Sequence, residues 1–365
     1  MNNDINAVYV HIPFCNNICS YCDFCKMYYN FELVDKYLDA LDKEIKGKYQ
    51  NNNIRTLYIG GGTPSSLTLE QIDKLFLILK QIKVNSDAEI TFEMNVNDIT
   101  EELLQKLKDN KVNRISIGIE TINDKFLKLL NRNHTKQDVI SKIDLSKKYF
   151  NNINVDFMYA FPDQTLDDLI LDLEFFKTLD VNHISIYSLI LEKNTKLYID
   201  NVSPLNEEVE SRMYYYIIKY LKDLGYIHYE VSNFAKKGYQ SNHNLIYWNN
   251  QKYYGFGLGA SGFINNIRYT NTRSINHYLE GDFTLEEEVI TKKIDMENEM
   301  ILGLRKMEGV NIKTFFDKYK INIIDAFDID DLLDKNILRI KDSYIYIDDK
   351  YLYLSNQILV RFIDT

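Results

Sequence analysis

The sequence predicts an α/β fold, a partial (β/α)6 barrel followed by a small C-terminal helical, winged-helix-like domain. Short apolar runs rich in Ile, Val, Tyr and Phe alternate with amphipathic helical patterns as far as about residue 224. Strand–helix units in a row imply parallel strands joined by crossover helices. From about residue 285 the pattern changes to short helical segments and a hairpin.

Six strands are expected in the barrel, and amphipathic stretches lie between them. The strands are predicted at residues 7–12, 56–59, 89–94, 114–119, 154–159 and 183–189. The clearest helices are predicted at 33–45, 67–82 and 164–178, where apolar residues recur at helical spacing. Chemistry in such sheets gathers at the carboxyl ends of the strands. The loops that follow the first two strands are therefore the expected site.

We expect three parts along the chain: the barrel at 1–225, an aromatic, loop-rich connecting region at 226–283, and a C-terminal domain at 284–365. In the last part, helices are predicted at 286–304, 312–320, 324–335 and 356–363. Strands at 337–340 and 344–347 form the hairpin, with KDS between them. Helices followed by a hairpin are typical of a winged helix.

Composition excludes several classes of protein. The 365 residues include 43 basic and 53 acidic side chains, a net charge of −10, whereas nucleic-acid binders carry a basic stripe. Hydrophobic residues at 45% indicate a globular chain. No apolar run approaches the ~18 residues of a membrane span, and MNNDINAVYV lacks the features of a signal peptide. We expect a cytoplasmic protein without a transmembrane segment.

All 4 cysteines fall within eleven positions, and Cys15, Cys19 and Cys22 are spaced C-x3-C-x2-C directly after the first strand. Three thiolates on one tight loop can bind three corners of a [4Fe–4S] cluster and leave one iron without a protein ligand. Zinc with Cys25 or His11 as fourth ligand is the alternative, but no second ligand pair is present. Disulfides are rare in the cytoplasm. The spacing favours a cluster, with Cys25 as a small buried thiol.

Glycine is scarce and concentrated in two loops. Of the 14 glycines, three are consecutive at 60–62 after the second strand, and four lie between 255 and 262. Glycine lets the backbone approach a ligand that a side chain would block. Beside the cysteine loop, ligand contact is a better interpretation than a simple tight turn.

A C-x3-C-x2-C loop after the opening strand and a GGGTP loop after the second resemble the radical S-adenosylmethionine (SAM) superfamily. Within it, the chain resembles the oxygen-independent coproporphyrinogen III oxidase family, and most of all its haem-chaperone (HemW) branch. The segments that carry the resemblance are YVHIPFCNNICSYCDF, GGGTPS, EITFE, NRISIGIE, YSLILEKNT, YEVSNFA, HNLIYWNN and MILGLRKMEG. The true oxidases have a further Cys two positions after the third one, where this chain has Phe24.

The resemblance implies a radical-SAM core with a [4Fe–4S] cluster on the three cysteines. It assigns SAM binding to Tyr9, Gly61, Gly62, Thr63, Glu93, Glu120, Arg132 and Asp156. Arg132 can pair with the SAM carboxylate, and Glu93 or Asp156 can accept hydrogen bonds from its ammonium or ribose. The family commonly has Gln-Ser where this chain has Glu120-Thr121, so an acceptor replaces an amide donor.

The segment His243–Trp248, HNLIYW, matches the H-N-x-x-Y-W motif of the haem chaperones and implies haem as a further cofactor. A neutral imidazole is a common axial haem ligand, so His243 is the candidate. The implied function is a haem chaperone that delivers haem to membrane haemoproteins, with at most a peripheral membrane contact and no nucleic-acid partner. The alternative is an oxygen-independent coproporphyrinogen III oxidase, so enzymatic turnover stays open.

Overall fold

The computed structural model describes residues 5–363 and contains a large, curved sheet of twelve strands. Seven neighbouring strands are parallel, and six of them confirm the predicted barrel strands. In order across the sheet these are β11 (Tyr253–Phe256), β1 (Ala7–Ile12), β4 (Ile54–Gly61), β5 (Val84–Asn95), β6 (Arg114–Glu120), β7 (Ile153–Tyr159) and β8 (His183–Ser188).

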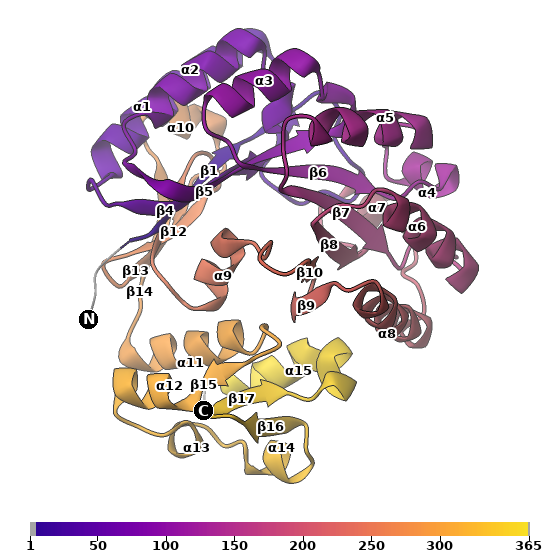
Figure 1. Cartoon of the computed structure of the whole chain (residues 1–365). Helices are drawn as coiled ribbons and strands as arrows, with labels where there is room; N and C mark the ends of the chain where they lie inside the picture. Colours follow the sequence, from indigo (N-terminus) through magenta and orange to yellow (C-terminus); the bar gives the residue numbers. More distant parts are fainter. Residues whose placement is uncertain (1–4, 364–365) are drawn as a thin grey trace.

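Helices cover the convex outer face of this sheet (Figure 1). The crossover helices are α1 (Phe31–Lys48), α2 (Leu69–Leu79), α3 (Glu101–Asp109), α4 (Asp124–Leu129), α5 (Lys136–Lys147), α6 (Leu166–Thr178), α7 (Lys196–Ile199) and α8 (Glu207–Asp223). Thr68, Thr135 and Thr165 begin α2, α5 and α6 with reciprocal capping boxes, which satisfy backbone N–H groups that the first turn leaves unpaired.

Side chains alternate between the two faces of each strand, which separates the core from the lumen. On β6, Ile115, Ile117 and Ile119 are fully buried in the hydrophobic core. The alternate residue Ser116 hydrogen-bonds across the inner face, accepting from Asn154 Nδ2 at 2.7 Å and donating to Asp156 Oδ2 at 3.3 Å. The concave side is therefore polar.

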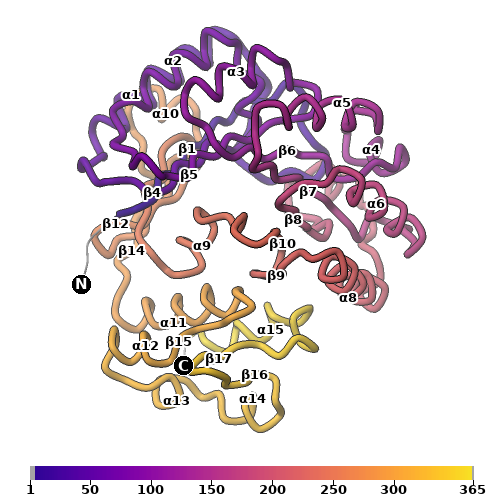
Figure 2. The backbone as a smooth tube through the Cα atoms, viewed as in Figure 1, coloured from indigo at the N-terminus to yellow at the C-terminus, as the bar shows by residue number. Residues whose placement is uncertain are grey.

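The region predicted as loop-rich instead adds strands to both edges of the sheet. β9 (Ile227–Glu230) and β10 (Asn233–Ala235) lie beyond β8, whereas β12 (Ser261–Ile264) and β13 (Ile267–Asn271) lie beyond β11. Between them the chain crosses the concave side through the short helix α9 (Asn242–Trp248) (Figure 2). Glycines interrupt the strand pattern there because a Cβ on Gly262 would lie 2.3 Å from the Tyr269 ring.

The C-terminal part lies below the open side of the barrel (Figure 1). It contains α11 (Lys292–Gly303), β15 (Val310–Asn311), α12 (Ile312–Tyr319), α13 (Ile323–Ala326), α14 (Asp330–Asp334), β16 (Leu338–Lys341), β17 (Tyr344–Ile347) and α15 (Ser355–Leu359). Before it in the chain, α10 (Ile275–Glu280) lies beside α1, and β14 (Thr284–Val289) pairs with β13 at the edge of the large sheet. The hairpin prediction is confirmed by β16 and β17, which form a three-stranded sheet with β15.

Two helix predictions in this part are wrong. The helix expected at 286–304 begins only at Lys292, since the preceding glutamates lie on β14, opposite β13. The helix expected at 324–335 is two short helices, because Phe327 is extended and buried between them. The last expected helix is α15 followed by a single 3-10 turn at Val360–Phe362.

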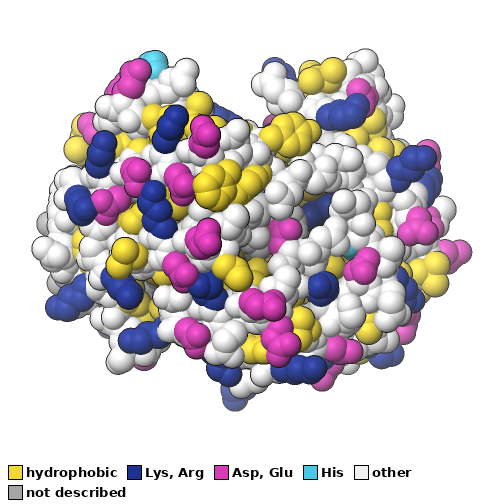
Figure 3. All heavy atoms as spheres, turned by 90° about the horizontal axis from the view of Figure 1, so that it is seen from above, with side chains coloured by type: hydrophobic (Ala, Val, Ile, Leu, Met, Phe, Trp, Pro, Cys, Tyr) yellow, Lys and Arg dark blue, Asp and Glu magenta, His cyan; other side chains and the backbone are white. Residues whose placement is uncertain are grey.

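The surface seen in Figure 3 intersperses acidic and basic side chains. Within residues 5–363, no helix is both long enough and apolar enough to cross a membrane.

Candidate functional site

The three cysteines of the motif lie on the loop that follows the first barrel strand. β2 (Phe14–Cys15) pairs with β3 (Met27–Tyr28) and closes this loop at its base. Inside it, the Cys22 N–H donates to the Cys19 carbonyl at 3.3 Å and forms a turn. All three thiols are free and line one cavity of about 140 Å³, which we call the cysteine cavity.

The thiols suit a cluster better than a single ion. Burial raises the pKa of Cys15 to about 11 and also raises the pKa of Cys19 and Cys22, whereas the Arg132 guanidinium acts in the opposite direction on all three. Among the described residues, no three Cys, His, Asp or Glu side chains converge as the ligands of one metal ion would. Thiols that surround a cavity instead fit an iron–sulfur cluster.

His11, one candidate for a fourth zinc ligand, binds the backbone carbonyl of Cys25, the other candidate, whose thiol is free. His11 Nε2 is 2.7 Å from the Cys25 carbonyl oxygen, and Nδ1 is 2.9 Å from the Tyr9 hydroxyl. Both ring nitrogens therefore have partners within the protein. The Cys25 side chain packs against Gly259, where a Cβ would lie 2.7 Å from the Cys25 Cβ.

The glycine loop lies directly against the cysteine loop. Gly61 has a φ of +119°, and a Cβ there would lie 2.7 Å from the His11 ring. A Cβ on Gly62 would lie 2.8 Å from the Pro13 carbonyl carbon and 3.0 Å from Cys15 Sγ. The Thr63 hydroxyl donates to Cys15 Sγ at 3.4 Å. These glycines are required by the close approach of two loops.

Two partly buried carboxyl groups, those of Glu93 and Asp156, also line the cysteine cavity. Glu93 accepts from the Tyr58 hydroxyl at 2.6 Å and from the Gly61 N–H at 2.9 Å. Burial raises the pKa of Glu93 to about 7 and that of Asp156 to about 6. Asp156 also accepts from Asn154 Nδ2 at 2.9 Å. Both groups can accept hydrogen bonds from a cationic or hydroxylated ligand.

Arg132 and Glu120 form a buried ion pair with each other. Arg132 donates to Glu120 through Nη2 and to Asn95 through Nη1. Glu120 also accepts from the Tyr21 hydroxyl at 2.9 Å. Arg132 Nε and Glu120 Oε2 are buried without a hydrogen-bond partner, so each group keeps one polar atom for a ligand. The pair presents a donor and an acceptor side by side.

Seven of the eight residues assigned to SAM line the cysteine cavity: Gly61, Gly62, Thr63, Glu93, Glu120, Arg132 and Asp156. Tyr9 instead lines a second cavity of about 520 Å³, which we call the aromatic cavity. Tyr58 belongs to the wall between the two, since its ring lines the aromatic cavity and its hydroxyl binds Glu93. One hydrogen bond thus connects the two sites.

The aromatic cavity lies between the concave face, α9 and the β11–β13 edge of the sheet. It is lined by Tyr9, Tyr58, His243, Asn244, Tyr247, Asn250, Gln251, Tyr253, Ser261, Phe263, Arg268 and Leu302. The ring centroids of Tyr247 and Tyr253 are 4.5 Å apart, and those of Tyr58 and His243 are 5.1 Å apart. Aromatic rings that gather around a cavity, here alongside several polar side chains, are typical of sites for flat organic ligands.

His243 lies on α9 at the edge of this cavity. Nδ1 is 2.8 Å from Thr56 Oγ1, and Nε2 is 2.8 Å from the Tyr247 hydroxyl. The Glu89 carboxylate accepts from the backbone N–H groups of Asn242 and His243, which fixes the start of the helix. Burial lowers the pKa of His243 to about 3, so the ring is neutral at physiological pH.

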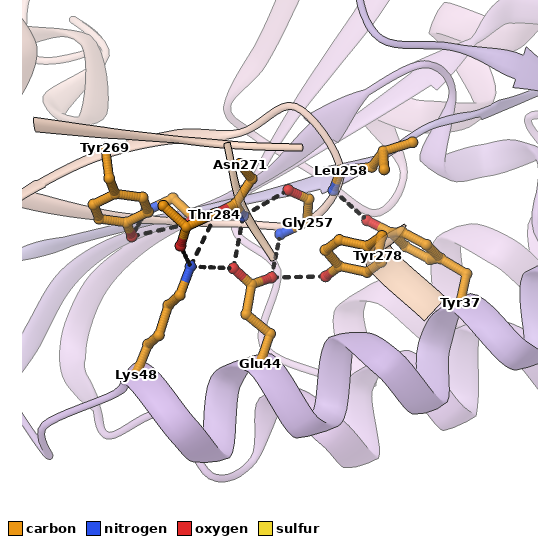
Figure 4. A network of polar contacts seen from close by, with 10 residues as sticks. Tyr37, Glu44, Lys48, Gly257, Leu258, Tyr269, Asn271, Tyr278 and Thr284 are labelled. Atoms are coloured by element: carbon orange, nitrogen blue, oxygen red, sulfur yellow. Dashed lines mark hydrogen bonds and ion pairs between the residues drawn. The ribbon is translucent and has the colours of Figure 1, made fainter. Parts of the chain in front are cut away.

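A polar network binds the β11–β13 edge to α1 (Figure 4). The Glu44 carboxylate is fully buried and accepts from the Gly257 N–H at 2.8 Å, from Asn271 Nδ2 at 2.6 Å and from the Tyr278 hydroxyl at 2.7 Å. Lys48 pairs with Glu44 at 3.1 Å. The outer wall of the aromatic cavity is therefore held by the helix that follows the cysteine loop.

Sequence reasoning missed Tyr21 and Asn95 in the cysteine cavity and Tyr58, Phe263 and Arg268 in the aromatic cavity. Tyr21 lies within the cysteine motif but not at one of its ligand positions, and the other four lie outside any motif of closely spaced functional residues. For Tyr58 a signal was available in the sequence. Thr56 and Tyr58 alternate with apolar residues on β4, and this alternation indicates that both side chains point to the inner face of the sheet.

Residues 9–176 match the Radical SAM superfamily. The protein named Heme chaperone HemW of Lactococcus lactis is 39% identical over 369 residues, which cover 98% of this chain and 97% of the relative. Heme chaperone HemW of Bacillus subtilis is 36% identical, with 98% of this chain and 99% of the relative covered. These alignments span practically the whole of each protein.

Among solved structures, coproporphyrinogen III oxidase (HemN) from Escherichia coli superposes with a TM-score of 0.88 over 99% of this chain and 91% of that one. At 20% identity this match shows the fold. The cysteine loop, the glycine loop and the full-length likeness to curated relatives agree, and the chain belongs to the HemW family of radical SAM proteins.

Proposed function

We propose that this protein is a haem chaperone that binds a [4Fe–4S] cluster, SAM and haem, and delivers haem to membrane haemoproteins from the cytoplasm. The observation that carries the proposal is the aromatic cavity of about 520 Å³ with His243 at its edge, next to a separate cysteine cavity. The names of the HemW relatives support haem as the ligand.

In this proposal, Cys15, Cys19 and Cys22 hold the cluster as thiolates. When bound, a reduced cluster supplies an electron for reductive cleavage of SAM. The glycine loop lets backbone groups approach SAM, while Arg132 and Glu120 offer it one donor and one acceptor. Glu93 and Asp156 accept its remaining polar hydrogens.

His243 has the properties that an axial ligand of haem iron requires. With Nδ1–H donating to Thr56, the lone pair of Nε2 points at the Tyr247 hydroxyl, which an iron atom would replace. The low pKa keeps this lone pair free of a proton. Tyr247 and Tyr253 provide ring faces against which a porphyrin can pack.

The test is anaerobic reconstitution with iron and sulfide, followed by a haem titration and a coproporphyrinogen III assay. We expect a Soret band in the wild type, and in His243→Ala a shifted band and weaker binding with unchanged melting and cluster content. His277→Ala is the control because His277 is exposed on α10. A normal haem spectrum in His243→Ala removes the histidine from the site. Substantial coproporphyrinogen turnover would place the protein with the oxidases instead.

Delivery is tested separately, with haem-loaded protein and vesicles that carry an apo-haemoprotein. Transfer of the Soret absorbance to the vesicle fraction is expected. Retention of all haem by the chaperone would contradict the delivery step alone.

A further inference from the structure

One face of the sheet edge carries a row of side chains that changes from aromatic to cationic. Tyr253 on β11 lies opposite Phe263 on β12, and Phe263 lies opposite Arg268 on β13. Directly opposed residues of antiparallel strands share a face of the sheet. All three line the aromatic cavity. The row therefore forms one wall of that cavity.

Arg268 terminates this wall on the side away from His243. The ring contacts run from His243 to Tyr247, with centroids 4.9 Å apart, and from Tyr247 to Tyr253, 4.5 Å apart. Arg268 lies two strand spacings from Tyr253, with β12 between them, a distance of about 9–10 Å across the sheet. A flat macrocycle whose centre lies at His243 can therefore extend one edge along this wall toward the guanidinium.

The Arg268 guanidinium has no acceptor among the described residues. Its carbon lies 5.6 Å from the centroid of the Phe263 ring, which orients the group by cation–π attraction and leaves its N–H groups unused. Glu288 lies opposite Arg268 on β14, yet no ion pair joins the two within residues 5–363. Arginine is always protonated and matches a carboxylate with two parallel hydrogen bonds.

We propose that Arg268 binds the carboxylate groups of a flat aromatic macrocycle in the aromatic cavity, so that the propionate edge of haem lies at β13. The assignment rests on the proposed haem function and adds the orientation of the ligand to it. The aromatic side chains of the cavity contact the apolar body of the macrocycle, and Arg268 selects ligands that carry a carboxylate at the edge next to β13. An uncharged tetrapyrrole would lose this contact.

The experiment titrates two probes, haem and haem dimethyl ester, into the reconstituted full-length protein and follows the Soret band. The variants are Arg268→Ala, Arg268→Lys and, as control, Arg212→Ala, since Arg212 is exposed on α8 away from the cavity. Cluster content and melting temperature are measured for each variant, which separates lost ligand contact from lost folding.

For haem, we expect Arg268→Ala to weaken binding roughly ten- to hundredfold and Arg268→Lys to weaken it less, because a charged hydrogen bond is lost or reduced to a point charge. The ester should bind the wild type and Arg268→Ala equally, because the ester has no carboxylate for Arg268. Equal haem affinity in the wild type and Arg268→Ala overturns the assignment. Absence of haem binding by the wild type overturns the proposed function, and with it this inference.

Discussion

Replacing Glu120 by Gln should strengthen SAM binding, because the Glu120 carboxylate neutralises the Arg132 guanidinium, which is the expected partner of the SAM carboxylate. Both members of the Arg132–Glu120 ion pair are nearly buried, with side-chain exposures of 9% and 6%. A guanidinium that already binds one carboxylate attracts a second one weakly. Gln keeps the size of the side chain and an acceptor oxygen but removes the negative charge.

The size of the effect follows from the contacts of Arg132. A hydrogen bond to a charged group contributes about 1.5–3 kcal/mol, which corresponds to roughly ten- to hundredfold in affinity. We expect the lower end, about tenfold, because Nη1 stays bound to Asn95 at 2.5 Å. Folding should become less stable by less than the about 3–5 kcal/mol that loss of a buried partner costs, since the amide oxygen still accepts from Nη2.

Isothermal titration of SAM into the anaerobically reconstituted protein measures this change, with iron content and melting temperature recorded for each variant. Tyr21→Phe is the matched control: it removes a hydroxyl that donates to Glu120 at 2.9 Å but leaves the carboxylate and Arg132 paired. No gain in affinity is expected there. If Glu120→Gln binds SAM more weakly, the negative charge of Glu120 contributes to SAM binding and the reasoning is refuted. An unchanged affinity refutes it as well.

Three further predictions concern the cluster, protonation and folding. Cys19→Ser should lose iron on reconstitution whereas Cys25→Ser retains it, and equal iron loss in both, by iron and sulfide analysis, would disprove the ligand set. Burial raises the pKa of Glu93 from 4.5 to about 7, so its contribution to stability is fully present below about pH 4.5 and is lost as the pH rises through 7. Between pH 4.5 and 8, the melting temperature should therefore fall less steeply with pH in Glu93→Gln than in the wild type. An equal pH dependence in both would contradict the pKa shift. Glu44→Ala should lower the free energy of unfolding by about 3–5 kcal/mol because the buried partners in Figure 4 lose their acceptor. The exposed Glu32→Ala on the same helix should lower it by less than about 1 kcal/mol in urea titrations, and a similar loss in both would count against the network.

The parts of this protein that could be predicted are those whose pattern lies within a short stretch of sequence. The barrel strands follow from apolar runs, and the cysteine and glycine loops follow from the spacing of scarce residues. Both signals are local in sequence. The strands β9 to β14 were not found, because glycines at close contacts and a run of glutamates on β14 break the expected pattern.

The contacts that the sequence did not reveal form between residues that come together only when the chain folds. Arg132 was assigned to the SAM carboxylate, yet its pairing with Glu120 depends on the left-handed backbone of Glu120, which has a φ of 63°. Tyr9 was assigned to SAM by resemblance, whereas its ring lines the aromatic cavity. No spacing rule connects Phe263 with Tyr253 before the strands are paired.

The helix α1 is a mechanical connection between the two cavities. Tyr37 donates to the His11 carbonyl at 2.6 Å, next to the cysteine loop, and accepts from the Leu258 N–H at 3.1 Å, next to the aromatic cavity. The Leu258 and Gly257 amides are thus locked by the same helix that receives the chain from the cysteines. We therefore expect the hydrogen-exchange rates of these two amides to rise when the cysteine loop loses its order, so that loss of the cluster becomes measurable in the chain between β11 and β12.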